Sequence, residues 1–134
     1  MGRHRADQVT VQPGAVLLLD SSIHEIRRLV IQEGGRVECA GPCELRIAEH
    51  VWLGPRAYLG PNEVLPASDM VVFVAGNGNV AFQAARASRV RGSVYAINSR
   101  MRLGARGEYE GSFVAISIWV LPGAAFRQPA GLGG

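Results

Sequence analysis

The two cysteines are the residues of this chain best placed for covalent chemistry. Cys39 and Cys43 flank the segment Ala40-Gly41-Pro42, whose glycine and proline favour a turn. Such a turn would bring the two sulfurs within disulfide reach, and a disulfide would indicate an oxidising compartment. The alternative is that both are small side chains facing the core. A zinc site at the cysteines is less favoured, because no second cysteine pair or nearby histidine pair completes four ligands.

The histidines and carboxylates lack the spacing that catalysis needs. Sequence neighbours such as His24 and Glu25 point to opposite faces of a strand, so they make a poor acid–base pair. Enzymes that cleave polysaccharides need carboxylates at defined separations, whereas Asp20 and Asp69 are isolated. The chain has no nucleophile elbow, P-loop or dinucleotide fingerprint. We therefore expect no enzymatic activity, no cofactor and no bound metal, and we interpret the scattered histidines as solvated surface residues: His4, His24 and His50.

Arginine supplies all fourteen basic side chains, and the formal net charge is +3. Six arginines fall in one stretch without acidic residues, and on stacked strands they would form a basic stripe. Such a stripe could bind phosphate or an acidic polysaccharide, while nucleic acid is not the expected partner. The alternative is a solvated outer face partly paired with Glu108 and Glu110. The candidate stripe consists of Arg86, Arg89, Arg91, Arg100, Arg102 and Arg106.

The elements that must position these residues follow from an internal repeat. Short alternating segments such as Val9-x-Val11 end in glycines that recur every twenty residues, at Gly14, Gly34 and Gly54. Further along, the segment 92–98 returns nineteen residues later as 111–117. A fixed period of this length is typical of repeat architectures, and the alternation indicates strands with one buried face. We expect glycines near residues 14, 34, 54, 104 and 123 to mark equivalent corners.

A coil of nineteen to twenty residues holds three short strands, and stacked coils pair each strand with its copy above and below. The sequence therefore predicts a single all-β domain, a parallel β-solenoid (right-handed β-helix) of about six coils. It would span residues 9–127, between a flexible leader at 1–8 and a flexible glycine-rich tail at 128–134, with a loop insertion at 61–69. The offset of nineteen also places Arg89 over Glu108 and Arg91 over Glu110.

One segment favours a different fold. Asn77-Gly78 lies between two strand-like runs, which is a strong signal for an antiparallel hairpin. An antiparallel β-sandwich is therefore the alternative, although it does not explain the sustained period.

The repeat residues resemble a known type of bacterial domain. Segments 92–98, 103–105 and 110–115 look like the C-terminal coils of uncharacterised right-handed solenoid domains in bacterial cell-surface and type IV pilus-associated proteins. Those coils often read G-x-x-Y-A-P-N, and Ile97 stands here in place of the proline. In coil length and size the chain is also similar to bactofilins, cytoskeletal solenoids that polymerise end to end without nucleotide. Both resemblances imply a structural or binding role and supply no catalytic residue.

The two ends of the predicted solenoid have no obvious cap. Natural solenoids cover their terminal strand edges, whereas the glycine-rich C-terminal segment is unsuited to a capping helix. We therefore expect a structural protein that associates end to end into a filament or scaffold, or a surface module that binds an acidic polymer through the arginine stripe. No transmembrane segment or signal peptide is expected, which leaves a cytoplasmic protein or a trimmed cell-surface domain. The candidate assembly end consists of Ile118, Trp119, Val120 and Phe126.

Overall fold

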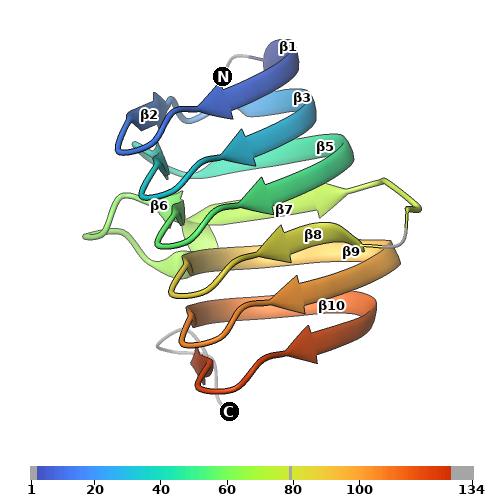
Figure 1. Cartoon of the computed structure of the whole chain (residues 1–134). Coiled ribbons are helices and arrows are strands. Elements are labelled where there is room, and N and C mark those ends of the chain that lie inside the picture. Colours follow the sequence, from blue (N-terminus) through green and yellow to red (C-terminus); the bar gives the residue numbers. More distant parts are fainter. Residues whose placement is uncertain (1–2, 79, 128–134) are drawn as a thin grey trace.

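The computed structural model describes residues 3–78 and 80–127, whose regular secondary structure is almost entirely parallel β-strand. The strands wind into a β-solenoid of about six turns, with the N-terminus at the top of Figure 1 and the C-terminus at the bottom. Every strand pairing in these residues is parallel, so the predicted solenoid is confirmed and the antiparallel sandwich is wrong. The runs on either side of Asn77-Gly78 lie in one coil and do not pair with each other.

The strand bounds follow the alternation of apolar and polar residues, because alternation turns one side of each strand toward the axis. The elements are β1 (Arg3–Val11), β2 (Val16–Leu19), β3 (Ile23–Ile31), β4 (Arg36–Cys39), β5 (Cys43–Leu53), β6 (Tyr58–Pro61), the 3₁₀ turn η1 (Ala67–Asp69), β7 (Met70–Val74), β8 (Val80–Ala84), β9 (Arg89–Leu103), β10 (Glu108–Val120) and β11 (Ala125–Arg127).

The strand register divides the solenoid into three faces. Face 1 carries the short strands β2, β4 and β6, face 2 carries β7, and face 3 carries β8; the longer strands bend from one face to the next. Face 1 comprises residues 16–19, 36–39, 58–61, 89–92, 108–111 and 125–127. Face 2 comprises 3–6, 23–26, 44–47, 70–74, 93–96 and 112–115, and face 3 comprises 8–11, 28–31, 50–53, 80–84, 100–103 and 117–120.

The corner between face 3 and face 1 repeats in every coil, but its equivalent residues are not all glycines. One corner position has positive φ throughout, and its occupants are Gly14, Gly34, Arg56, Ala87, Arg106 and Gly123. The predicted corners at Gly54 and Gly104 are therefore offset by two residues from the true equivalents. These two glycines serve close approach instead, because a Cβ on Gly54 would lie 2.9 Å from the backbone nitrogen of Glu33. The same atom on Gly104 would lie 2.3 Å from the carbonyl carbon of Ala85.

A single column of apolar side chains fills the axis. Burying a large aliphatic side chain contributes roughly 1.5–3 kcal/mol, so this column is the main source of stability. Two buried tyrosines interrupt it, and their hydroxyls find partners: Tyr58 donates to the Pro61 carbonyl at 2.6 Å, and Tyr109 to the Gly104 carbonyl at 3.3 Å. The fully buried aliphatic residues include Leu29, Ile31, Val37, Leu45, Val51, Leu59, Met70, Val72, Val90, Val94, Met101 and Leu103.

The first strand begins earlier in the chain than the sequence predicts. The leader predicted at 1–8 is wrong for its described part, because Arg3 onward belongs to β1 and pairs with β3. The loop insertion is confirmed as the segment that projects to the left after β6 in Figure 1. The stacking of 92–98 on 111–117 holds as far as Ala96 and Ala115, after which a bulge shifts the register. The tail at 128–134 lies outside the described residues.

Candidate functional site

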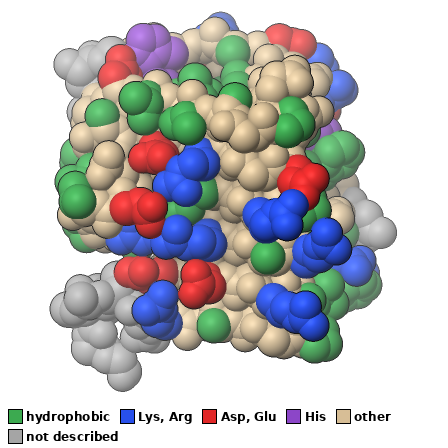
Figure 2. Space-filling model, turned by 60° about the vertical axis from the view of Figure 1, so that its left-hand side comes forward, with side chains coloured by type: hydrophobic (Ala, Val, Ile, Leu, Met, Phe, Trp, Pro, Cys, Tyr) green, Lys and Arg blue, Asp and Glu red, His purple; other side chains and the backbone are tan. Residues whose placement is uncertain are grey.

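The six candidate arginines lie on two faces and the corner between them. Arg89 and Arg91 belong to face 1, Arg100 and Arg102 to face 3, and the corner carries the remaining two, Arg86 and Arg106. Figure 2 shows the basic side chains in two groups, of which the left-hand group is interleaved with acidic side chains. The six residues therefore form two different surfaces rather than one stripe.

The arginines of face 1 are neutralised by acidic partners. Arg89 lies 3.0 Å from Glu63 and 3.4 Å from Glu108, while Arg91 lies 3.4 Å from Glu110. The predicted pairs of Arg89 with Glu108 and of Arg91 with Glu110 are confirmed by the strand register. Although burial lowers the pKa of Arg91, its contacts with Tyr58 and Glu110 raise it overall. This surface is a structural ion-pair network.

Face 3 has the opposite character, because its six segments contain no aspartate or glutamate. The register places Trp52, Gln83, Arg102 and Trp119 on successive strands in one column. Trp52 is 46% exposed and Trp119 49% exposed, and the guanidinium of Arg100 lies 5.8 Å from the Trp119 ring. Among the described residues, none of Arg86, Arg100, Arg102 and Arg106 forms an ion pair. These four arginines therefore place uncompensated positive charge beside exposed aromatic rings, whereas Arg28 of face 3 and Arg56 of the corner are paired with Glu49 and Glu33.

A histidine extends this aromatic surface. The His50 ring stacks on Trp52 with their centroids 3.9 Å apart. Burial lowers the pKa of His50, and the nearby Arg28 lowers it further. The neutral ring is therefore favoured, and it adds a flat aromatic area without adding charge.

The cysteines occupy the corner between face 1 and face 2. Cys39 ends β4 and Cys43 begins β5, and the structure joins their sulfurs in a disulfide with the Cα atoms 6.2 Å apart. Both residues are buried, and both belong to the apolar core. The disulfide and the core-facing position, which the sequence analysis treated as alternatives, coexist.

The candidate assembly residues lie at the C-terminal end of the solenoid. Ile118, Trp119 and Val120 end β10, whose strand 117–120 pairs with β9 on one side only within the described residues. Phe126 lies in β11 and is 45% exposed, although its ring packs against Tyr109 and Phe113. These residues form an apolar rim around the last coil.

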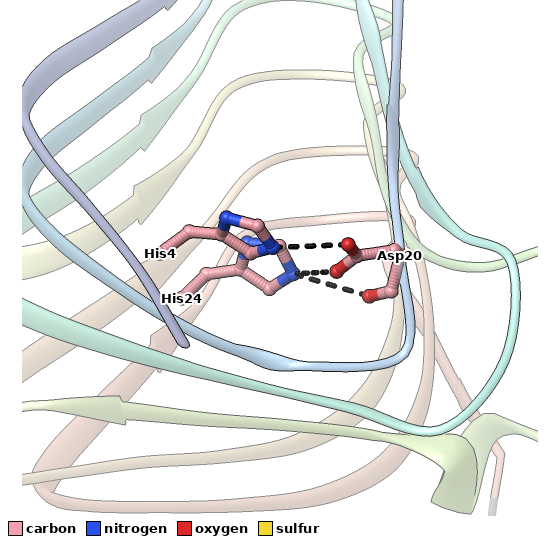
Figure 3. A group of neighbouring side chains, drawn as sticks. All are labelled: His4, Asp20 and His24. Atoms are coloured by element: carbon pink, nitrogen blue, oxygen red, sulfur yellow. Dashed lines mark hydrogen bonds and ion pairs between the residues drawn. The ribbon is translucent and has the colours of Figure 1, made fainter. Parts of the chain in front are cut away.

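The N-terminal end carries a cluster that sequence reasoning missed. His4 of β1 and His24 of β3 are register partners, and their rings stack with centroids 5.0 Å apart. Both rings turn toward Asp20, which follows β2 (Figure 3). The Nε2 of His4 is 2.9 Å from Asp20 Oδ2, and the Nε2 of His24 is 3.3 Å from Asp20 Oδ1. The twenty-residue period relates His4 to His24 and was the signal available in the sequence.

The fold defines the chain as a β-solenoid of short coils. Comparisons with protein-family models, with curated proteins and with solved structures found no match in any of the three. No helix in residues 3–78 and 80–127 has the length and apolar character needed to span a membrane.

Proposed function

We propose that this protein is a non-enzymatic structural β-solenoid that stacks end to end into a filament or scaffold. The observation that supports this proposal is that apolar, inward-facing side chains are only partly covered at both ends. At the N-terminal end these are Val9 and Leu17, and at the C-terminal end they are Phe113, Ala115 and Ile118. An exposed row of backbone groups beside an apolar surface is a template for further strand pairing.

The two ends fit each other because each presents the same three-faced edge. Faces 2 and 3 begin with β1 and end with β10, while face 1 begins with β2 and ends with β11. A second copy placed below the first would therefore align its β1 with β10 and its β2 with β11, as parallel neighbours. Such a head-to-tail contact does not close on itself, so repetition produces a filament.

The test compares two valine-to-lysine variants. Val120 is 47% exposed at the C-terminal rim, whereas Val64 is 90% exposed in the loop after β6, away from both ends. We expect wild type and Val64→Lys to form concentration-dependent assemblies in sedimentation velocity and fibres in negative-stain micrographs. Val120→Lys should remain a monomer, because lysine at an edge opposes strand pairing. A wild-type protein that stays monomeric at every accessible concentration would overturn the proposal.

A second function is supported by face 3. We propose that its arginines and tryptophans bind an acidic polysaccharide, in keeping with the cell-surface or pilus-associated spacer that the sequence resembles. Guanidinium groups pair with carboxylates or sulfates, and tryptophan rings stack on flat sugar surfaces. The observation that favours this surface is its freedom from acidic side chains, which distinguishes it from the ion-paired face 1.

The polysaccharide proposal is tested by titration with polygalacturonate, with neutral dextran as the control ligand. Arg100→Glu/Arg102→Glu should weaken binding at least about tenfold, equivalent to about 1.4 kcal/mol. The matched control is Arg3→Glu/Arg5→Glu, which makes the same charge change on face 2. Equal loss in both double variants would mean that only net charge matters, and this result would refute a specific face 3 site.

A further inference from the structure

The N-terminal histidine cluster unites three side chains whose donor atoms suit a metal ion. We propose that His4, Asp20 and His24 bind a divalent transition-metal ion, with Zn²⁺ as the best match, at the N-terminal end of the solenoid. His4 lies in β1, the strand that the proposed assembly would pair with β10 of a second copy, whereas the site is remote from the polysaccharide surface of face 3. Because zinc binding is measured on dilute, monomeric protein, its failure and the failure of assembly are separate outcomes.

The fold brings one donor atom from each of the three residues close together. One nitrogen of each histidine and one carboxylate oxygen of Asp20 all lie within 4.8 Å of one another. A tetrahedral Zn²⁺ with bonds of about 2.0–2.2 Å requires ligand atoms about 3.3–3.6 Å apart, so small side-chain rotations suffice. In Figure 3 both Nε2 atoms face the carboxylate, and a bound ion would replace the hydrogen bonds drawn there.

The donor set selects the class of metal. Two imidazole nitrogens and one carboxylate suit Zn²⁺ and its neighbours, whereas Mg²⁺ and Ca²⁺ prefer sites made only of oxygen. The Asp20 carboxylate faces both imidazole rings and supplies the negative charge that a cation needs. When an ion occupies Nε2 of a neutral ring, that ring carries its proton on Nδ1.

The fold preorganises the cluster unevenly. His24 is only 6% exposed, so burial limits the movement of its ring. Its Nε2 contacts the Asp20 carbonyl oxygen at 3.1 Å, and a metal ion bound at Nε2 would replace this contact. The His4 and Asp20 side chains are 54% and 62% exposed. The site therefore has one rigid inner ligand and two outer ligands that can adjust. Its solvent side leaves room for water as a fourth ligand, the arrangement of open zinc sites.

A bound ion would connect the first coil to the second. His4 lies in β1, Asp20 in the corner after β2, and His24 in β3, so the metal would fasten the terminal strand to its neighbour. Because the three residues converge only in the folded chain, binding must stabilise the folded state. This effect gives the proposal a readout that does not depend on knowing any activity.

The test uses untagged full-length protein that has been treated with chelator and dialysed. Isothermal titration with Zn²⁺ should show one ion per chain, and Zn²⁺ but not Mg²⁺ should raise the melting temperature. His4→Gln and Asp20→Asn should each weaken the affinity at least about tenfold. Both residues are exposed, so these variants should fold. His50→Gln is the matched control, because His50 lies outside the cluster and should leave zinc binding unchanged.

The histidine ring signals provide an independent measurement. On addition of Zn²⁺, the ring resonances of His4 and His24 should shift together while those of His50 stay in place. The proposal is overturned if wild type takes up no Zn²⁺, or if Asp20→Asn binds as tightly as wild type. It is also overturned if His50→Gln loses as much affinity as His4→Gln.

Discussion

Arg91 lies directly beside Glu110 on the next strand of face 1, with its Nε atom 3.4 Å from the carboxylate Oε1. The same guanidinium donates a hydrogen bond of 2.8 Å to the Leu65 carbonyl and contacts the Tyr58 hydroxyl. Its side chain is only 13% exposed. Arg91 therefore holds the loop after β6 against two coils of the solenoid.

We expect Arg91→Met to lower the free energy of unfolding by about 1–3 kcal/mol, because it leaves partly buried acceptors unpaired. Arg89→Met should cost less than about 1 kcal/mol, since the Arg89 ion pairs are more exposed. Urea unfolding of the two variants provides the comparison. If both variants lose the same free energy of unfolding, the contact between Arg91 and the loop does not contribute extra stability.

The coil period made the architecture and much of the register predictable from the sequence. Segments 92–96 and 111–115 have matching residue patterns, and the structure pairs them in the expected register. Local features were harder to predict, because corner geometry depends on backbone dihedral angles that several residue types can adopt. Arg56 and Arg106 occupy positions where glycine was expected, and this displaced the predicted corners by two residues.

The repeat pattern could not predict clusters of side chains that come from different strands and corners. The period relates His4 to His24, but the approach of Asp20 depends on how the chain turns after β2. The prediction that the six arginines form one stripe was wrong for a similar reason. Two bends and the face 2 segment 93–96 lie between Arg89 and Arg102 along β9, so proximity in the sequence did not place them on one face.

Gly111 should tolerate no side chain. Its φ is +132°, and a Cβ would lie 1.8 Å from the carbonyl oxygen of Gly92 on the neighbouring coil. We expect Gly111→Ala to destabilise the protein by roughly 3 kcal/mol or more, because the backbones of two coils would have to separate. Gly78→Ala is the control, since a Cβ there meets nothing within 4 Å. Circular dichroism during thermal unfolding measures both, and similar melting temperatures would contradict the stacked-glycine geometry.

Replacing Ala87 with glycine should stabilise the protein, although an alanine-to-glycine substitution usually destabilises a folded chain. Its φ of +57° lies in the left-handed region, which costs a residue with a Cβ roughly 1–2 kcal/mol. Part of this gain is offset by the greater freedom of glycine in the unfolded chain. Ala87→Gly should therefore raise the urea midpoint, whereas Ala105→Gly, at a corner position without positive φ, should lower it. A lower midpoint for Ala87→Gly would contradict the corner conformation.

The corner between faces 2 and 3 should make stability depend on pH. Hydrogen bonding to Arg27 lowers the pKa of Asp7, and hydrogen bonding to Arg28 lowers the pKa of Glu49. Because both pKa values are lower in the folded state, their contribution to stability is complete above about pH 5 and is lost as the pH falls below about 4. Urea midpoints between pH 7 and pH 3 should fall less for Asp7→Asn/Glu49→Gln than for wild type. If the urea midpoint decreases equally in wild type and in the double variant, these two carboxylates do not contribute to the pH dependence of stability.

The Cys39–Cys43 disulfide should add modestly to stability, because it closes a very short loop. Four residues of sequence separation correspond to a chain-entropy contribution of about 2 kcal/mol. Cys39→Ala/Cys43→Ala should lower the urea midpoint accordingly and should retain the solenoid, since both positions also contribute to the apolar core. Reductant should destabilise wild type but leave the double variant unchanged. Alkylation followed by mass spectrometry should label both cysteines only after reduction and unfolding; labelling of unreduced, unfolded protein would show that the bond does not form.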